Sequence, residues 1–152
     1  EEGIAMTRDM AHGIAPLGLE SDGLIAALRG LAANVSRMFK IACTLECDAP
    51  PLIEDVNVAT HLYRIAQEAV QNALRHGKPR QIVMSLGHAR GRAELTIEDD
   101  GAGLPENWQS GGGLGTRTMA HRAAMIGGML SIEPNPTGGT FVRCSVPLAH
   151  AA

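Results

Sequence analysis

Aromatic side chains are scarce in this chain of 152 residues, at 3% of the total. A hydrophobic core must therefore be built from Leu, Ile, Val, Ala and Met, and the length allows one compact domain. Cysteine is also rare. Cys43, Cys47 and Cys144 are too few for a disulfide framework, and no further metal ligands accompany them. We therefore expect reduced thiols, buried or half-buried, in a cytoplasmic protein.

Excess positive charge and long apolar runs are missing as well. The formal net charge is −3 and no basic stripe is present, which argues against direct binding of nucleic acid. No apolar run reaches the roughly 20 residues that span a bilayer, and no signal peptide is visible. The chain begins at Glu1 inside a segment with weak helical character. We therefore expect a fragment of a longer protein, whose membrane anchoring stays open.

Two familiar nucleotide-binding motifs are absent. The chain has no G-x-x-x-x-G-K-[ST] sequence, which excludes a P-loop, and no G-x-G-x-x-G, which leaves a Rossmann pocket without support. The six histidines show no metal-ligand spacing such as H-E-x-x-H. A nucleotide site in this chain must therefore be built from other motifs.

Hydrophobic periodicity predicts an alternation of helices and strands. The helix over 57–76 is the clearest element, with Asp55 or Asn57 as its N-cap and Gly77 as a left-handed C-cap. Neighbouring strands joined by short turns, such as 88–91, indicate a mixed, mostly antiparallel sheet with helices on one face. This is an α/β two-layer sandwich. The expected helices are 22–38, 57–76 and 116–126, and the expected strands are 40–47, 81–86, 92–99, 129–133 and 140–147.

The predicted helix 57–76 carries three polar residues that can act on one ligand. Glu68 and Asn72 are four residues apart and share a face, and Arg75 lies three residues further on. An amide oxygen can bind a hard cation such as Mg²⁺, and an arginine can neutralise phosphate. The alternative is a solvated polar face with ordinary pairing along the helix. Taken alone, the pattern favours that alternative.

The strand 92–99 ends in Asp99-Asp100-Gly101-Ala102-Gly103. Asp99 is placed to accept a hydrogen bond from an exocyclic amine such as that of adenine. Gly101 and Gly103 would let a flat ring approach the backbone closely. An ordinary turn explains the same residues equally well.

Glycine is concentrated in two further places. The loop 100–115 contains six glycines and is long for a compact domain, which is typical of a functional lid. Its last residues, Gly113-Leu114-Gly115, lead into a predicted helix, and the amides at a helix N-terminus bind phosphate. A flexible linker is the alternative. Gly138-Gly139-Thr140 precedes the last strand and, taken alone, is a glycine-rich turn.

Together and in this order, these blocks resemble the motifs of the histidine-kinase/gyrase/chaperone/mismatch-repair ATPase superfamily, with its Bergerat-type nucleotide fold. The resemblance extends over residues 40–148. Within the superfamily, the sequence of these motifs is most similar to sensor histidine kinases of the nitrate-sensor-like class. The stretches that carry the resemblance are 62–69, the N box at 68–76, the glycine boxes at 99–103 and 113–119, residues 121–123, and the last block at 138–140.

The resemblance implies ATP and Mg²⁺ as cofactors. Asn72 would ligate Mg²⁺ and Arg75 would contact phosphate. Glu68 would be catalytic, assisting the metal or activating the phosphoacceptor, although many sensor kinases have Asn at this position. Asp99 would bind adenine with Thr140 in support, and Asp100 would be a turn residue. The remaining cofactor-binding residues implied are Gly101, Gly103, Gly113, Leu114 and Gly115.

The resemblance also implies a division of the chain and a reaction. Residues 1–38 would hold the end of the dimerisation helices and the linker, and residues 39–152 the ATP-binding catalytic domain. The γ-phosphoryl of ATP would pass to a histidine on the dimerisation helices of a homodimeric parent, and then to a response regulator. The context of His12 is poor for that histidine, which we expect to lie outside the fragment. An anti-sigma-type serine kinase and a non-catalytic nucleotide-binding interaction module are the alternatives.

Overall fold

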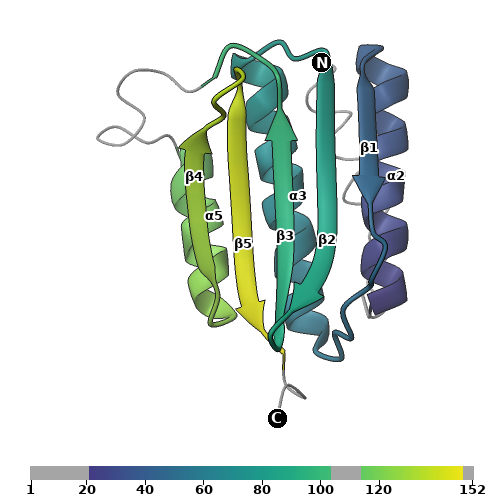
Figure 1. Cartoon of the computed structure of the whole chain (residues 1–152), viewed down its shortest axis with the longest axis vertical. Helices are drawn as coiled ribbons and strands as arrows, with labels where there is room; N and C mark the ends of the chain where they lie inside the picture. The colour runs from purple at the N-terminus through teal and green to yellow at the C-terminus, as the bar shows by residue number, and fades with distance from the viewer. Residues whose placement is uncertain (1–20, 104–113, 149–152) are drawn as a thin grey trace.

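The computed structural model describes residues 21–103 and 114–148, which form a two-layer α/β sandwich (Figure 1). Three described helices cover one face of a five-stranded sheet. The strand order is β1-β2-β3-β5-β4, with β1 parallel to β2 and every other pair antiparallel. The predicted fold class is confirmed. The elements are α2 (Ser21–Phe39), β1 (Ala42–Glu46), α3 (Val56–His76), β2 (Gln81–Ala89), β3 (Arg92–Asp99), α5 (Leu114–Met125), β4 (Met129–Pro134) and β5 (Thr140–Pro147).

Helix α2 is part of the same packing unit as the sheet. It lies beside β1 and α3 (Figure 1), and its side chains Leu28 and Leu31 are buried in the shared core. The Ser36 hydroxyl accepts a hydrogen bond from the Cys43 amide and donates one to the Cys43 carbonyl, at 3.0 and 3.1 Å. Among the described residues, those on either side of the expected domain boundary at residue 38 therefore pack against each other without a break.

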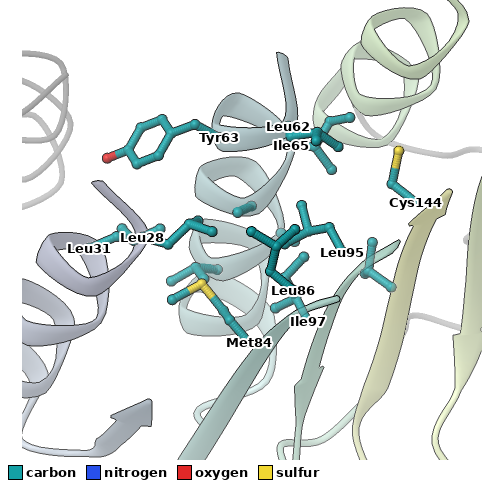
Figure 2. Packing of buried hydrophobic residues seen from close by; sticks show 14 of the residues in the cluster. Leu28, Leu31, Leu62, Tyr63, Ile65, Met84, Leu86, Leu95, Ile97 and Cys144 are labelled. Carbon is teal, nitrogen blue, oxygen red and sulfur yellow. The ribbon is translucent and has the colours of Figure 1, made fainter. Parts of the chain in front are cut away.

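The core between helices and sheet is almost entirely aliphatic, as the scarcity of aromatic residues requires (Figure 2). Leu62 and Ile65 of α3 belong to the same buried cluster as Leu86 and Leu95 of the central strands. Tyr63 is the one buried aromatic side chain of the described residues. Burial of this kind contributes about 1.5–3 kcal/mol for each large aliphatic side chain. It holds α3 firmly against the sheet, which fixes the polar residues on the opposite face of the helix.

The cysteines are free, and burial raises the pKa of the Cys43 and Cys144 thiols to about 11. Both thiols are therefore protonated near neutral pH and pack as small hydrophobic groups. None of the helices that the structure describes is long and apolar enough to cross a membrane.

Two turns differ from the sequence prediction. Strand β2 continues to Ala89, so Arg90 and Gly91 alone form the turn to β3, with φ of 55° and 75°. Gly77 is not left-handed: its φ is −106°, and its amide still donates to the Ala73 carbonyl in helical fashion. The chain reverses one residue later, at Lys78, with φ of 47°. At the other end of α3, the Asp55 carboxylate caps the helix by accepting from the Asn57 amide at 2.8 Å.

Candidate functional site

One end of the sandwich brings together three segments that are far apart in sequence. They are the end of α3, the end of β3 and the turn between β4 and β5, at the upper edge of Figure 1. The Gly77 carbonyl accepts from the Ala102 amide at 2.8 Å, and a Cβ on Gly101 would lie 2.5 Å from that carbonyl oxygen. A Cβ on Gly139 would lie 1.9 Å from the Asp99 carbonyl oxygen. Only glycine permits backbones to approach this closely.

This junction holds Asp99, a residue that is 6% exposed. Asp99 Oδ1 accepts a hydrogen bond from the Gly101 amide at 2.8 Å, and the Thr140 amide also donates to this carboxylate. Burial raises the pKa of Asp99, and the two amide hydrogen bonds offset part of that rise. The result is a rigid acceptor at the end of β3, suited to a ligand amine.

The neighbouring Asp100 has a different role. Its exposed Oδ1 accepts from the amides of Arg80 and Gln81 at 2.8 and 3.0 Å. These hydrogen bonds, the one from Gln81 first, lower the pKa of Asp100. Asp100 thus ties the start of β2 to the end of β3, which agrees with its interpretation as a turn residue.

The polar face of α3 brings Glu68, Asn72 and Arg75 together, as the helical spacing predicted. Arg75 Nη2 donates to Asn72 Oδ1 at 2.9 Å and lies 3.5 Å from Glu68 Oε2. Glu68 and Asn72 are half-buried, whereas Arg75 is exposed. In this arrangement the Arg75 guanidinium is hydrogen-bonded to the Asn72 amide oxygen, which is the atom that a metal ion would bind.

The oxygen ligands on this face of α3 fit a magnesium ion that is shared with phosphate. Among the described residues, no group of three or more His, Cys, Asp or Glu side chains could hold a metal by itself. Mg²⁺ is usually held by one or two protein oxygens together with substrate phosphates and water. The Asn72 amide oxygen and the Glu68 carboxylate supply hard oxygens of this kind.

The remaining predicted residues fall into three groups. Thr140 begins β5 beside Asp99, and Gly103, with φ of 91°, lies against the turn that contains Gly139. Leu114 and Gly115 are the first residues of α5, so this glycine block does open a helix, two residues before the predicted start. Gly113, the rest of the proposed lid and His12 lie outside the described residues.

Sequence reasoning missed a contact between α3 and α5. Arg122 Nη1 of α5 lies 3.3 Å from His61 Nδ1 of α3. Burial lowers the pKa of His61, and the positive charges of Arg122 and His121 lower it further. Because a guanidinium can only donate, the contact requires an unprotonated Nδ1. The sequence contains no signal for this contact, because its two residues are 61 positions apart on different helices.

Comparison with known proteins agrees with this geometry. The sequence profile of the "histidine kinase-, DNA gyrase B-, and HSP90-like ATPase" family matches residues 57–150. The nitrate/nitrite sensor proteins NarX and NarQ of Escherichia coli are 32% and 33% identical over 126 and 130 residues, which is 83% and 85% of this chain. The sensor histidine kinase LiaS of Bacillus subtilis is 29% identical over 133 residues, or 88% of this chain. The chain spans only 21%, 23% and 36% of the lengths of NarX, NarQ and LiaS.

Solved structures give the same result. The histidine kinase domain of the blue-light activated histidine kinase from Erythrobacter litoralis EL346 superposes with a TM-score of 0.71 at 26% identity, covering 84% of this chain and 62% of that one. The ATP binding domain of PrrB from Mycobacterium tuberculosis superposes with a TM-score of 0.68 at 26% identity, covering 79% and 90% of the two chains. By its sequence profile, its relatives among the sensor histidine kinases and its fold, the chain belongs to the histidine kinase-, DNA gyrase B-, and HSP90-like ATPase family.

Proposed function

We propose that this chain is the ATP-binding catalytic domain of a two-component sensor histidine kinase. It would transfer the γ-phosphoryl of ATP to a histidine on the dimerisation helices of a homodimeric parent, for relay to a response regulator in the cytoplasm. The observation that carries the proposal is the buried Asp99 carboxylate, fixed by two backbone amides at a junction that only glycine can form. An acceptor so placed suits the exocyclic amine of adenine.

The two ends of the nucleotide would be bound by different elements. Asp99 would accept from the adenine amine, and Thr140 would support it through its hydroxyl or a water molecule. The C-terminal half of α3 would face the phosphates, because Asn72 and Arg75 lie on its polar side. Gly101, Gly103, Gly113, Leu114 and Gly115 complete the proposed cofactor-binding residues, and their glycines would allow close approach of the nucleotide. In this proposal, residues 1–38 hold the end of the dimerisation helices and the linker.

Catalysis here consists mainly of positioning and charge stabilisation, as in other phosphoryl transfers. Magnesium, when bound, would neutralise charge on the phosphates. Arg75 would leave Asn72 and turn to the phosphates, which frees the Asn72 oxygen for the ion. The acceptor imidazole nitrogen would attack the γ-phosphorus as the bond to ADP breaks, and Glu68 would orient that imidazole and take up its proton.

The test is incubation of the longer parent protein with γ-labelled ATP. A phosphohistidine, which is labile to acid and stable to base, is the expected product. Asn72→Ala should abolish labelling, whereas the matched change Asn57→Ala, in the exposed first turn of α3, should leave it intact. An acid-stable phosphoserine would instead identify a serine kinase. Nucleotide binding with no label on the protein would identify a non-catalytic module.

A further inference from the structure

Asn135, in the turn between β4 and β5, makes a side-chain hydrogen bond to β3 at the end of the sheet that holds Asp99 (Figure 1). Its Nδ2 donates to Oε2 of Glu98 at 3.1 Å. Because β5 lies between β4 and β3, this hydrogen bond connects the end of β4 to a strand that is not its neighbour in the sheet. Glu98 directly precedes Asp99 in β3. The turn is therefore joined to the residue beside the proposed adenine acceptor.

The turn is restricted at its first half and free at its second. Asn135 lies between Pro134 and Pro136, whose rings fix φ, and a residue before proline is confined to extended backbone. Gly138 and Gly139 follow, with φ of 107° and 95°. The Asn135 amide donates to the Gly139 carbonyl and the Gly138 amide to the Asn135 carbonyl, both at 2.9 Å. These two hydrogen bonds close the turn upon itself but do not attach it to β3.

The backbone pairing of β3 with β5 stops short of Asp99, since its last pair at this end is Glu98 with Phe141. Beyond that pair, the Thr140 amide donates to the Asp99 carboxylate and Gly139 lies against the Asp99 backbone. Both contacts require the turn to stay close to the end of β3. A side-chain hydrogen bond between the turn and Glu98 favours that position.

We propose that Asn135 is a positioning residue for the nucleotide: its hydrogen bond to Glu98 is a latch that holds the β4–β5 turn in place and so keeps the Thr140 amide on the Asp99 carboxylate. Without the latch, the turn would leave β3 more often, and only the remaining fraction of molecules could bind nucleotide. Because the Glu98 carboxylate is exposed, one hydrogen bond to it limits the loss of affinity to about three- to tenfold. This inference rests on the proposed function, because it takes Asp99 as the acceptor for adenine.

The test exchanges the donor and the acceptor of the latch and measures the affinity of this chain for AMPPNP with Mg²⁺ by isothermal titration calorimetry. Asn135→Asp places two carboxylates face to face and should weaken binding about three- to tenfold. Glu98→Gln keeps an acceptor oxygen for Asn135 and should change binding less than about twofold. The double variant with both changes restores the hydrogen bond in the reverse direction, so its affinity should return to within about twofold of the wild type.

Two affinity controls accompany the exchange. The double variant of Asn135→Asp and Glu133→Gln has the same net charge as the rescued variant, but it alters an exposed glutamate of β4 instead. It should bind as weakly as Asn135→Asp alone. In Asn135→Asp, adenosine should lose affinity by the same factor as AMPPNP, because the latch acts at the base, which both ligands share. Glu98→Ala removes the acceptor and serves for these measurements if Asn135→Asp does not fold.

Amide hydrogen exchange in the ligand-free chain, followed by NMR, separates the latch from a general loss of stability. In Asn135→Asp the Thr140 amide should exchange about three- to tenfold faster, because the turn leaves β3 more often. The Gly101 amide donates to Asp99 from within the same segment, so its exchange should change less than about twofold. A general loss of stability would accelerate both amides.

The outcomes also separate this inference from the proposed function. Unchanged affinity in Asn135→Asp would overturn the inference, as would failure of Glu98→Gln to restore binding or an equal rescue by Glu133→Gln. A loss for AMPPNP without a loss for adenosine, or equal acceleration of the Thr140 and Gly101 amides, would overturn it too. Failure of the wild-type chain to bind AMPPNP would instead overturn the proposed function, and the inference with it.

Discussion

Replacement of Gly139 by alanine is expected to damage both stability and the nucleotide site, whereas the same change at Gly138 is expected to be mild. Both glycines have positive φ, 95° and 107°, so alanine at either position carries a backbone penalty of about 1–2 kcal/mol. A Cβ on Gly138 has open space, with the Gly101 oxygen 4.0 Å away. A Cβ on Gly139 would lie 1.9 Å from the Asp99 carbonyl oxygen and 2.9 Å from its Oδ1.

Relief of the Gly139 clash requires a backbone shift of more than 1 Å, because real Cβ atoms essentially never approach within 3.0 Å of such an oxygen. The shift must separate β5 from the end of β3, in a closely packed region. We expect Gly139→Ala to lower the free energy of unfolding by about 3–5 kcal/mol, against about 1–2 kcal/mol for Gly138→Ala. The shift also moves Asp99, so adenosine affinity should fall at least about tenfold in the folded Gly139→Ala protein.

Urea denaturation at 25 °C gives the first quantity and calorimetric titration with adenosine gives the second. Gly138→Ala is the matched control, since it differs only in the absence of the clash. Equal destabilisation by the two changes would refute the reasoning. Unchanged adenosine affinity in Gly139→Ala would show that Asp99 does not depend on this junction.

Three other changes test separate parts of the structure. Arg90→Asn should raise the free energy of unfolding by about 0.5–1 kcal/mol, as measured by urea denaturation. Arg90 is left-handed in this two-residue turn, and Asn adopts that conformation more readily than Arg does. No gain in stability would contradict the turn geometry. Asp100→Ala should lower the free energy of unfolding by about 0.5–1 kcal/mol with nucleotide affinity unchanged, since the Asp100 carboxylate accepts from the backbone amides of Arg80 and Gln81. A loss of affinity by calorimetry would place Asp100 in the site. Burial, first, holds the pKa of His61 below 6.5 in the folded chain, so below neutral pH the unfolded chain binds that proton more readily and stability falls. His61→Gln should therefore lose less stability than the wild type between pH 7 and pH 5. Identical losses would exclude His61 as a source of the pH dependence of stability.

The sequence was sufficient to predict the elements that rest on local periodicity. The apolar stripe of α3 and the alternation along the strands indicated where these segments lie and which faces they bury. Close approaches between distant segments were not predictable. Gly77 was expected to be left-handed because glycine often ends helices in that way, yet its role depends on Gly101, which lies 24 residues further along the chain. The predicted helix 22–38 likewise carried no local sign that β1 and α3 pack against it.

The same distinction holds for the candidate site. Glu68, Asn72 and Arg75 share a face because helical geometry alone brings them together. Asp99 was chosen from its place before two glycines, but the second amide that holds it comes from Thr140, on another strand. The contact between His61 and Arg122 joins residues 61 positions apart on two helices, so no local pattern could supply it.

The most direct test of the account is the affinity of this chain for ATP with Mg²⁺, compared between the wild type and Asp99→Asn by calorimetric titration. Asn removes the acceptor charge and presents an amide donor to the adenine amine, so binding should weaken by a factor on the order of one hundred or more. Asp100→Asn, which keeps its acceptor oxygen for Arg80 and Gln81, should bind as the wild type does. Equal ATP affinity in Asp99→Asn and the wild type would contradict the assignment of Asp99 as the residue that reads adenine.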